Sequence, residues 1–221
     1  MKEKTKFYYL SLPKGYVAKK TIDAKEKKTA ILFTLLSFVI LAAVIAILLF
    51  TRRVDFDLFF SNSTKLLIAD AALIGTMILY IIIHELTHGI GYKLFTREKL
   101  KFGVTLTCAF CGVPNSYVKK WPAFITTLLP FFTYSCILFP LYYLTSSVYV
   151  QVVSGFILAL HLSGCIGDLT VAGYLLLKAD KSTLVNDDGA KQVFYEYSEE
   201  KYKEDLEKEN EGNISTESQG L

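Results

Sequence analysis

The sequence predicts an all-α membrane protein with four transmembrane helices and a short cytoplasmic β-hairpin between the second and third helices. Three observations lead to this fold class. Apolar residues fill 52% of the 221 positions, they gather in long runs between residues 29 and 177, and both ends of the chain are strongly polar. A soluble domain of this length rarely carries such a surplus of apolar side chains.

Four of the apolar runs are long enough to cross the hydrocarbon core of a bilayer, which takes about 20 residues in helical conformation. They cover residues 30–50, 66–92, 122–144 and 148–177. The first run has no charged residue, whereas the second and the fourth contain histidine and acidic residues. A short polar turn at 145–147 separates the last two runs, so we expect these helices to form an antiparallel pair.

The distribution of lysine and arginine sets the expected orientation, because basic loops remain on the cytoplasmic side of a membrane. Residues 1–28 hold nine of them, residues 93–121 six and residues 178–221 six, against three in residues 51–65. With both termini in the cytoplasm, 21 of the 24 basic residues lie on that side. We therefore expect a basic cytoplasmic tail (1–28), a four-span domain in the cell membrane (29–177), and an acidic, partly disordered cytoplasmic tail (178–221).

The segment between the second and third runs differs from its surroundings. Residues 101–107 alternate between polar and apolar side chains and include β-branched residues, and a turn-forming Cys-Gly-Val-Pro-Asn sequence follows. This pattern predicts a short β-hairpin within residues 100–118. Cys108 and Cys111 form a single CxxC in this segment. Without a second pair we expect them to have a structural role rather than to bind zinc.

The second apolar run ends in His84-Glu85-Leu86-Thr87-His88, which is an HExxH sequence. Residues four apart lie on one face of a helix, so both imidazoles can reach one metal ion, with Glu85 beside them. A helix end near the lipid headgroups is the alternative explanation. Histidine and glutamate are unfavourable in lipid, however, and rarely occur there without a role. We interpret His84 and His88 as zinc ligands and Glu85 as the general base that takes a proton from zinc-activated water.

Asp168, in the fourth run, is the best candidate for the third protein ligand that catalytic zinc usually has. Asp70 lies about 21 Å before His84 along the same helix, and Glu98 lies in a basic loop close after the motif. Asp168 precedes Lys178 by ten residues, which places it about 15 Å deep along the helix. An unpaired carboxylate is strongly unfavourable there. Metal binding would offset this cost, and pairing with a polar neighbour is the alternative.

Two further polar residues are candidates for supporting the metal ligands or contacting a substrate. His161 lies seven residues before Asp168 on the same helix face, about 10 Å away along the axis. A hydrogen-bonded packing histidine is an equal alternative. Asn115, in the turn region of the expected hairpin, could donate a hydrogen bond to a developing oxyanion.

Three stretches of the sequence resemble the intramembrane zinc metalloproteases of the site-2 protease type. They are HELTHGIGY at residues 84–92, the basic-aromatic segment at 119–121 that leads to Leu-Leu-Pro at 128–130, and residues 161–168. The chain is similar to a family of small bacterial membrane proteins described as putative zincin peptidases. The resemblance implies an active site at cytoplasmic depth, an aspartate as third ligand, and a substrate presented as a β-strand.

Carried over residue by residue, the resemblance assigns His84, Glu85 and His88 directly and Asp168 as the third ligand. The sequence departs from better-known site-2 proteases at this aspartate, which follows Gly167 here instead of preceding a glycine. It also has no PDZ-like insertion.

Together these features predict an intramembrane zinc metalloprotease that hydrolyses peptide bonds of membrane-associated substrates. The expected cofactor is Zn²⁺, and the expected partners are the lipid bilayer and a protein or peptide substrate, with no nucleic acid. An extended substrate segment would add a strand to the hairpin, because peptide hydrolysis needs an extended backbone. The alternatives are a non-catalytic zinc-bound membrane assembly or transport factor, and a four-helix membrane protein without a metal.

Overall fold

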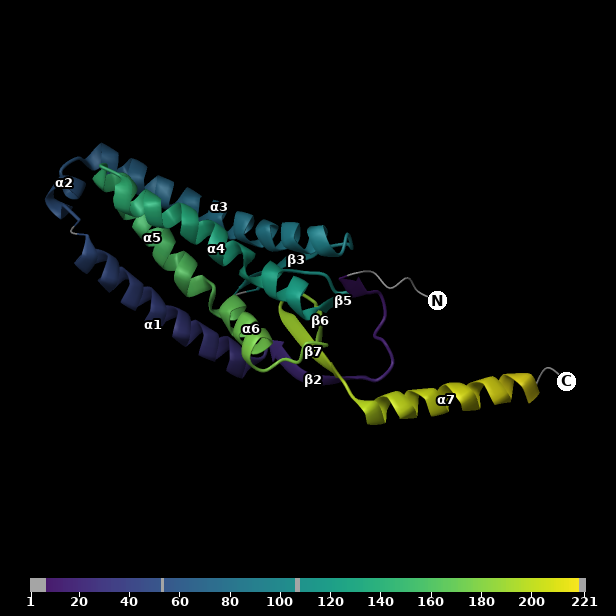
Figure 1. Ribbon diagram of the computed structural model, residues 1–221. Helices are drawn as coiled ribbons and strands as arrows, with labels where there is room; N and C mark the ends of the chain where they lie inside the picture. Colours follow the sequence, from purple (N-terminus) through teal and green to yellow (C-terminus); the bar gives the residue numbers. More distant parts are fainter. Residues whose placement is uncertain (1–6, 53, 106–107, 219–221) are drawn as a thin grey trace.

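The computed structural model describes residues 7–52, 54–105 and 108–218, and this part of the chain is mostly helical (Figure 1). Three helices are long and apolar enough to cross a membrane, and a fourth span is reached if two helices joined by a bend count as one. The three are α1 (Lys27–Thr51), α3 (Ser63–Phe95) and α4 (Lys120–Leu144), and the bent pair consists of α5 (Val148–Gly164) and α6 (Ile166–Leu177).

Apolar side chains cover the outward faces of these helices. Phe38 and Val39 on α1 are 65% and 66% exposed, and Leu67 on α3 is 70% exposed. Such a large exposed apolar surface is unfavourable in water. It indicates that lipid surrounds the helices, as expected of a membrane protein. The short helix α2 (Phe56–Phe60) connects α1 to α3 at the end of the bundle distant from both chain termini (Figure 1).

The apolar run at 148–177 forms two helices instead of the single expected one. The helices α5 and α6 meet at Cys165 with a bend of 43°. Gly164 and Gly167 flank this position, and glycine weakens a helix because it loses the most conformational freedom on folding. The bend places Asp168 in the first turn of a new helix.

A five-stranded antiparallel sheet lies at the end of the bundle where both chain termini emerge (Figure 1). The strand order is β1-β5-β6-β7-β2. The strands are β1 (Tyr8–Tyr9), β2 (Tyr16–Asp23), β5 (Tyr117–Lys119), β6 (Leu184–Asp187) and β7 (Lys191–Tyr197). The helix α7 (Glu199–Ser218) follows β7 and projects away from the bundle (Figure 1).

The predicted all-α fold class was incomplete, because the protein also contains this five-stranded sheet. Four of the five strands lie in segments predicted to be polar tails, because each strand is short and its surrounding segment is rich in charged residues. Their pairing is long-range, since β2 and β7 come from opposite ends of the chain. The apolar side chains that the strands contribute are buried against the helices, as Val118, Val185 and Phe194 show with exposures of 2% or less.

The hairpin between α3 and α4 consists of β3 (Lys101–Val104) and β4 (Ala109–Gly112). At its closed end the Thr105 N–H donates to the Cys108 carbonyl at 2.7 Å. Hydrogen-bonded pairs alternate along an antiparallel ladder. Ala109 and Cys111 therefore direct their backbone N–H and C=O groups away from β3, and β4 presents a second edge to the interior of the protein.

The turn between β6 and β7 holds the hairpin in place. The Val113 N–H donates to the Asp187 carbonyl at 2.8 Å. A Cβ atom on Gly112 would clash with the Gly189 nitrogen, and a Cβ atom on Gly189 would clash with Phe110 Cδ2, so neither position has room for a side chain. Gly189 also has a φ of +89°, a conformation that glycine adopts without strain. The hairpin is thus attached to the sheet as well as to α3.

Asp187 connects the sheet to α3 through a buried carboxylate. It accepts hydrogen bonds from the Tyr92 hydroxyl, from the Gly189 N–H at 2.7 Å and from Gln192 Nε2 at 3.3 Å. Burial raises the pKa of Asp187 from 3.8 to about 6, although these three donors and the charge of His88 act in the opposite direction.

We expect Asp187→Asn to remove a pH-dependent contribution to stability. Between the unfolded pKa near 3.8 and the folded pKa near 6, the folded state binds the proton more tightly. The free energy of unfolding therefore falls as the pH rises through this window, by up to ~3 kcal/mol. Thermal unfolding of the detergent-solubilised protein from pH 4 to pH 7 measures this effect as the difference between wild type and variant. If the stability of wild type and of Asp187→Asn changed with pH in parallel, this prediction would be contradicted.

Candidate metal centre

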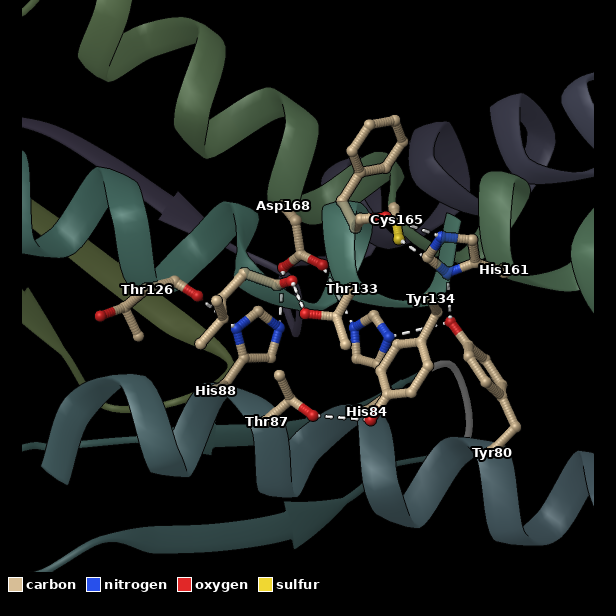
Figure 2. A network of polar contacts seen from close by, with 12 residues as sticks. Tyr80, His84, Thr87, His88, Thr126, Thr133, Tyr134, His161, Cys165 and Asp168 are labelled. Carbon is tan, nitrogen blue, oxygen red and sulfur yellow. Dashed lines mark hydrogen bonds and ion pairs between the residues drawn. The ribbon is translucent and has the colours of Figure 1, made fainter. Parts of the chain in front are cut away.

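Three side chains that the sequence analysis selected as metal ligands lie together in the structure (Figure 2). His84 and His88 lie one turn apart on α3, and Asp168 faces them from α6. His84 Nε2 is 3.3 Å from Asp168 Oδ2, and His88 Nε2 is 3.4 Å from Asp168 Oδ1. One donor atom from each residue lies within 4.8 Å of the other two. Two imidazole nitrogens and one carboxylate oxygen are a donor set that fits Zn²⁺ with an open fourth position.

Burial makes this cluster costly unless its charges are compensated. The side chains of His84, His88 and Asp168 are 10%, 8% and 23% exposed. A carboxylate in such surroundings requires an opposite charge or hydrogen-bond donors. In the absence of a metal the two imidazoles can donate to this carboxylate only when both of their ring nitrogens are protonated, whereas a divalent cation would satisfy all three groups together.

Glu85 lies at the border between this cluster and the hairpin. Its carboxyl group interacts with the backbone N–H of Cys111 on β4. A cavity of about 490 Å³ is lined by Glu85, by the three metal-binding candidates and by Cys111. Its other walls come from α1, from α5 and α6, and from the turn between β6 and β7. A molecule in this cavity would contact both the donor cluster and the interior edge of β4.

The orientation of His88 is fixed from α4. Its Nδ1 lies 3.0 Å from the carbonyl oxygen of Thr126. A carbonyl can only accept, so Nδ1 carries a hydrogen, and in the neutral imidazole Nε2 then has its lone pair free toward Asp168. Thr126 has this carbonyl available because Pro130, four residues later in α4, has no N–H to donate to it.

Two glycines that follow the HExxH sequence allow neighbouring elements to approach α3. A Cβ atom on Gly91 would lie 2.9 Å from Thr126 Cγ2 and 3.2 Å from Thr126 Cα. A Cβ atom on Gly89 would lie 3.0 Å from Leu100 Cδ1 and 3.2 Å from Phe102 Cζ. Gly91 thus makes room for the backbone that binds His88, and Gly89 makes room for the hairpin.

The other residues considered from the sequence lie outside the three-donor cluster. His161 is fully buried and contacts His84 indirectly, through the hydroxyl of Tyr80. Asn115 lies in an exposed turn after β4 and does not line the cavity, so the structure does not bring it to the site. Asp70 is exposed on α3, and Glu98 accepts a hydrogen bond from Tyr8 at 3.1 Å.

Two residues that form hydrogen bonds with the candidate histidine ligands, Thr126 and Tyr80, were not predicted from the sequence. Thr126 was not selected, although Pro130 within an apolar run indicates a free carbonyl four residues before it. Tyr80 was read as part of the apolar run, although its spacing of four residues from His84 places both on one face of the helix.

Part of the chain matches a known protein family. Residues 77–184 match the model of a family described as putative zincin peptidase. The matched segment contains His84, Glu85, His88, Thr126, His161 and Asp168. No curated protein and no solved structure matches the chain.

Gly91→Ala should weaken zinc binding and lower the melting temperature, because the added methyl group displaces Thr126 from His88. Gly75→Ala is the matched control on the same helix, since no atom lies within 4 Å of its added Cβ. Alanine there is expected to keep or slightly raise the melting temperature, because it removes the entropic cost of a helical glycine of about 0.5–1 kcal/mol. Zinc content after dialysis and thermal unfolding test both variants. Equal zinc retention in the two variants would show that the close approach of α4 is unimportant.

Pro130→Ala should weaken zinc binding by about tenfold or more, the usual effect of removing a hydrogen bond to a metal-binding histidine. The new alanine N–H would compete with His88 Nδ1 for the Thr126 carbonyl. Pro140→Ala is the control, because Pro140 lies in the same helix and frees a carbonyl at Cys136, distant from the cluster. Competition with a fluorescent chelator gives the dissociation constants. Wild-type affinity in Pro130→Ala would contradict this account of His88.

Proposed function

We propose that this protein is a zinc metallopeptidase that hydrolyses membrane-associated protein or peptide substrates, since residues 77–184 match the model of a family described as putative zincin peptidase. The convergence of His84, His88 and Asp168 beside Glu85, in one cavity, carries the proposal. The spacing and chemistry of these four side chains match the requirements of a hydrolytic zinc site.

Each of the four side chains has a role in this mechanism. Nε2 of His84, Nε2 of His88 and the Asp168 carboxylate would hold the ion. Bound zinc supplies a Lewis acid for the substrate carbonyl and lowers the pKa of a water molecule. Glu85 takes the proton from the attacking water and delivers it to the leaving amine. The backbone N–H of Cys111 interacts with this carboxyl group and holds it at the cavity wall.

The hairpin supplies a place for the substrate backbone. Ala109 and Cys111 on β4 direct their peptide groups away from β3, and both residues line the cavity together with Glu85. The Cys111 N–H is directed to Glu85, so an extended peptide would pair with the other peptide groups of this edge and pass beside Glu85 and the donor cluster. Strand addition of this kind fixes a substrate through its main chain, so a helical substrate would have to unwind locally.

The membrane arrangement follows from the same elements. In this proposal α1, α3, α4 and the bent α5–α6 pair form four spans, and the sheet lies on the cytoplasmic side with both chain termini. The distribution of basic residues supports this orientation, because 21 of 24 lie in the segments 1–28, 93–121 and 178–221, which this topology places in the cytoplasm. The cavity extends between the apolar side chains of Phe38 on α1 and Ile81 on α3, which suits a substrate that comes from the bilayer.

Zinc analysis and a cleavage assay on the same preparations test the proposal. We expect one zinc per chain in wild type, less in Asp168→Ala, and none in the double variant His84→Ala/His88→Ala. Glu85→Gln should keep the zinc and lose at least about 100-fold in cleavage rate, as expected for loss of a general base. The cleavage probe is a mixture of single-span membrane peptides in the same vesicles, analysed by mass spectrometry for new termini.

Glu98→Gln is the matched control, because this glutamate lies outside the site and should leave both readouts unchanged. Cleavage that persists in Glu85→Gln would refute the assignment of the base. Undiminished zinc in Asp168→Ala would assign the third ligand elsewhere. Zinc-loaded wild type that cleaves none of the peptides would favour a non-catalytic zinc-bound membrane factor.

A further inference from the structure

A chain of buried hydrogen bonds leads from His84 to the backbone of α4 (Figure 2). The Tyr80 hydroxyl lies 2.9 Å from His84 Nδ1 and 2.8 Å from His161 Nδ1. On the other side of its ring, His161 Nε2 lies 3.1 Å from the Phe131 carbonyl and 3.1 Å from Ser135 Oγ. Tyr80 and His84 are each 8% exposed, and His161 is fully buried. Polar groups this deeply buried need their hydrogen bonds, so the chain defines the local structure.

The Phe131 carbonyl sets the direction of every bond in this chain. A carbonyl only accepts, so His161 Nε2 carries a hydrogen and His161 Nδ1 offers its lone pair. The Tyr80 hydroxyl must then donate to His161 Nδ1. It has a single hydrogen, so its oxygen accepts from Nδ1–H of His84.

Nε2 of His84 is left with its lone pair on the side of Asp168, 3.3 Å from the carboxylate. This is the tautomer that binding through Nε2 requires. The opposite direction, with Tyr80 donating to His84, would leave a neutral His84 with its hydrogen on Nε2, where it would block the ion.

We propose that Tyr80 and His161 are positioning residues that fix the tautomer and ring orientation of His84 for metal binding. The proposal rests on the metal site of the proposed function but does not depend on peptidase activity. In His88 the same hydrogen position, on Nδ1, is fixed by a single acceptor, the Thr126 carbonyl. Each imidazole is thus held through its Nδ1–H by an acceptor that leads to α4.

The position of Tyr80 also accounts for a second group of side chains that could hold a metal. His84, His161 and Cys165 bring donor atoms within 4.8 Å of one another. The Tyr80 oxygen, however, lies within hydrogen-bond distance of Nδ1 in both histidines and occupies the space between them. We therefore assign this group to the hydrogen-bond chain and expect one zinc per protein rather than two.

Zinc dissociation constants of full-length variants test the proposal. Tyr80→Phe removes the hydroxyl and should weaken zinc binding by about 10–100-fold. Tyr134→Phe is the matched control, because its ring also lies beside His84 but its hydroxyl contacts Thr87 and the Ile83 carbonyl instead. Its affinity should stay within about threefold of wild type, well below the effect expected of a lost hydrogen bond to a ligand.

The two His161 variants separate hydrogen bonding from packing. His161→Gln keeps an acceptor for Tyr80 and a donor for the Phe131 carbonyl, so it should retain most of the affinity. His161→Leu keeps the volume and should resemble Tyr80→Phe. The double variant Tyr80→Phe/His161→Leu should be no weaker than either single variant, because both break the same chain. Thermal unfolding excludes variants that fail to fold.

Selective ¹⁵N labelling of histidine gives a second readout, which is simple to assign because the chain has only three histidines. We expect a hydrogen on Nε2 of His161 and on Nδ1 of His84 and His88 in the zinc-loaded protein. A hydrogen on Nδ1 of His161, wild-type affinity in Tyr80→Phe, or two zinc ions per chain would each overturn the proposal. If wild type binds no zinc, the metal site fails, and the His161 spectrum of the metal-free protein still decides the direction of the chain.

Discussion

An ionised carboxylate among apolar helices is tolerated only where other groups compensate its charge. Asp168 faces two imidazoles of α3, which compensate this charge when they are protonated or when all three side chains share a bound cation. Much of the helix arrangement serves this contact. The bend at Cys165 begins a new helix just before Asp168. The glycines after the HExxH sequence let α4 and the hairpin approach α3 from two other directions. Three elements that are distant in the sequence therefore meet around one small polar cluster.

Helix α4 contributes none of the three candidate metal ligands, yet its backbone carbonyls orient both histidines. The carbonyl of Thr126 accepts from His88, and the carbonyl of Phe131 anchors the chain through His161 and Tyr80 to His84. Pro130 lies between these two carbonyls and frees the first of them. The backbone of one helix thus selects the hydrogen position on both imidazoles, which a packing contact alone would not do.

The sequence predicted what depends on local pattern. Apolar run length located the helices to within a few residues, and HExxH spacing placed His84 and His88 on one face. Asp168 followed from the cost of an unpaired carboxylate. Strands β2 and β7 were missed because their partners come from opposite ends of the chain, so no local pattern marks the pairing. Tyr80 was missed because a tyrosine within an apolar run is indistinguishable from a packing residue until its partners are known.

The pairing of β2 with β7 also has a consequence for the order of assembly during synthesis. Every candidate ligand lies on α3 or α6, which leave the ribosome before β7 does. The turn between β6 and β7 forms one wall of the cavity and anchors the hairpin beside Glu85. In the nascent chain the candidate ligand side chains of α3 and α6 are therefore synthesised before the cavity wall formed by the turn between β6 and β7. A chain interrupted before residue 191 would carry the donor side chains without the strand β7, so a complete wall on this side of the cavity marks a chain translated past β7.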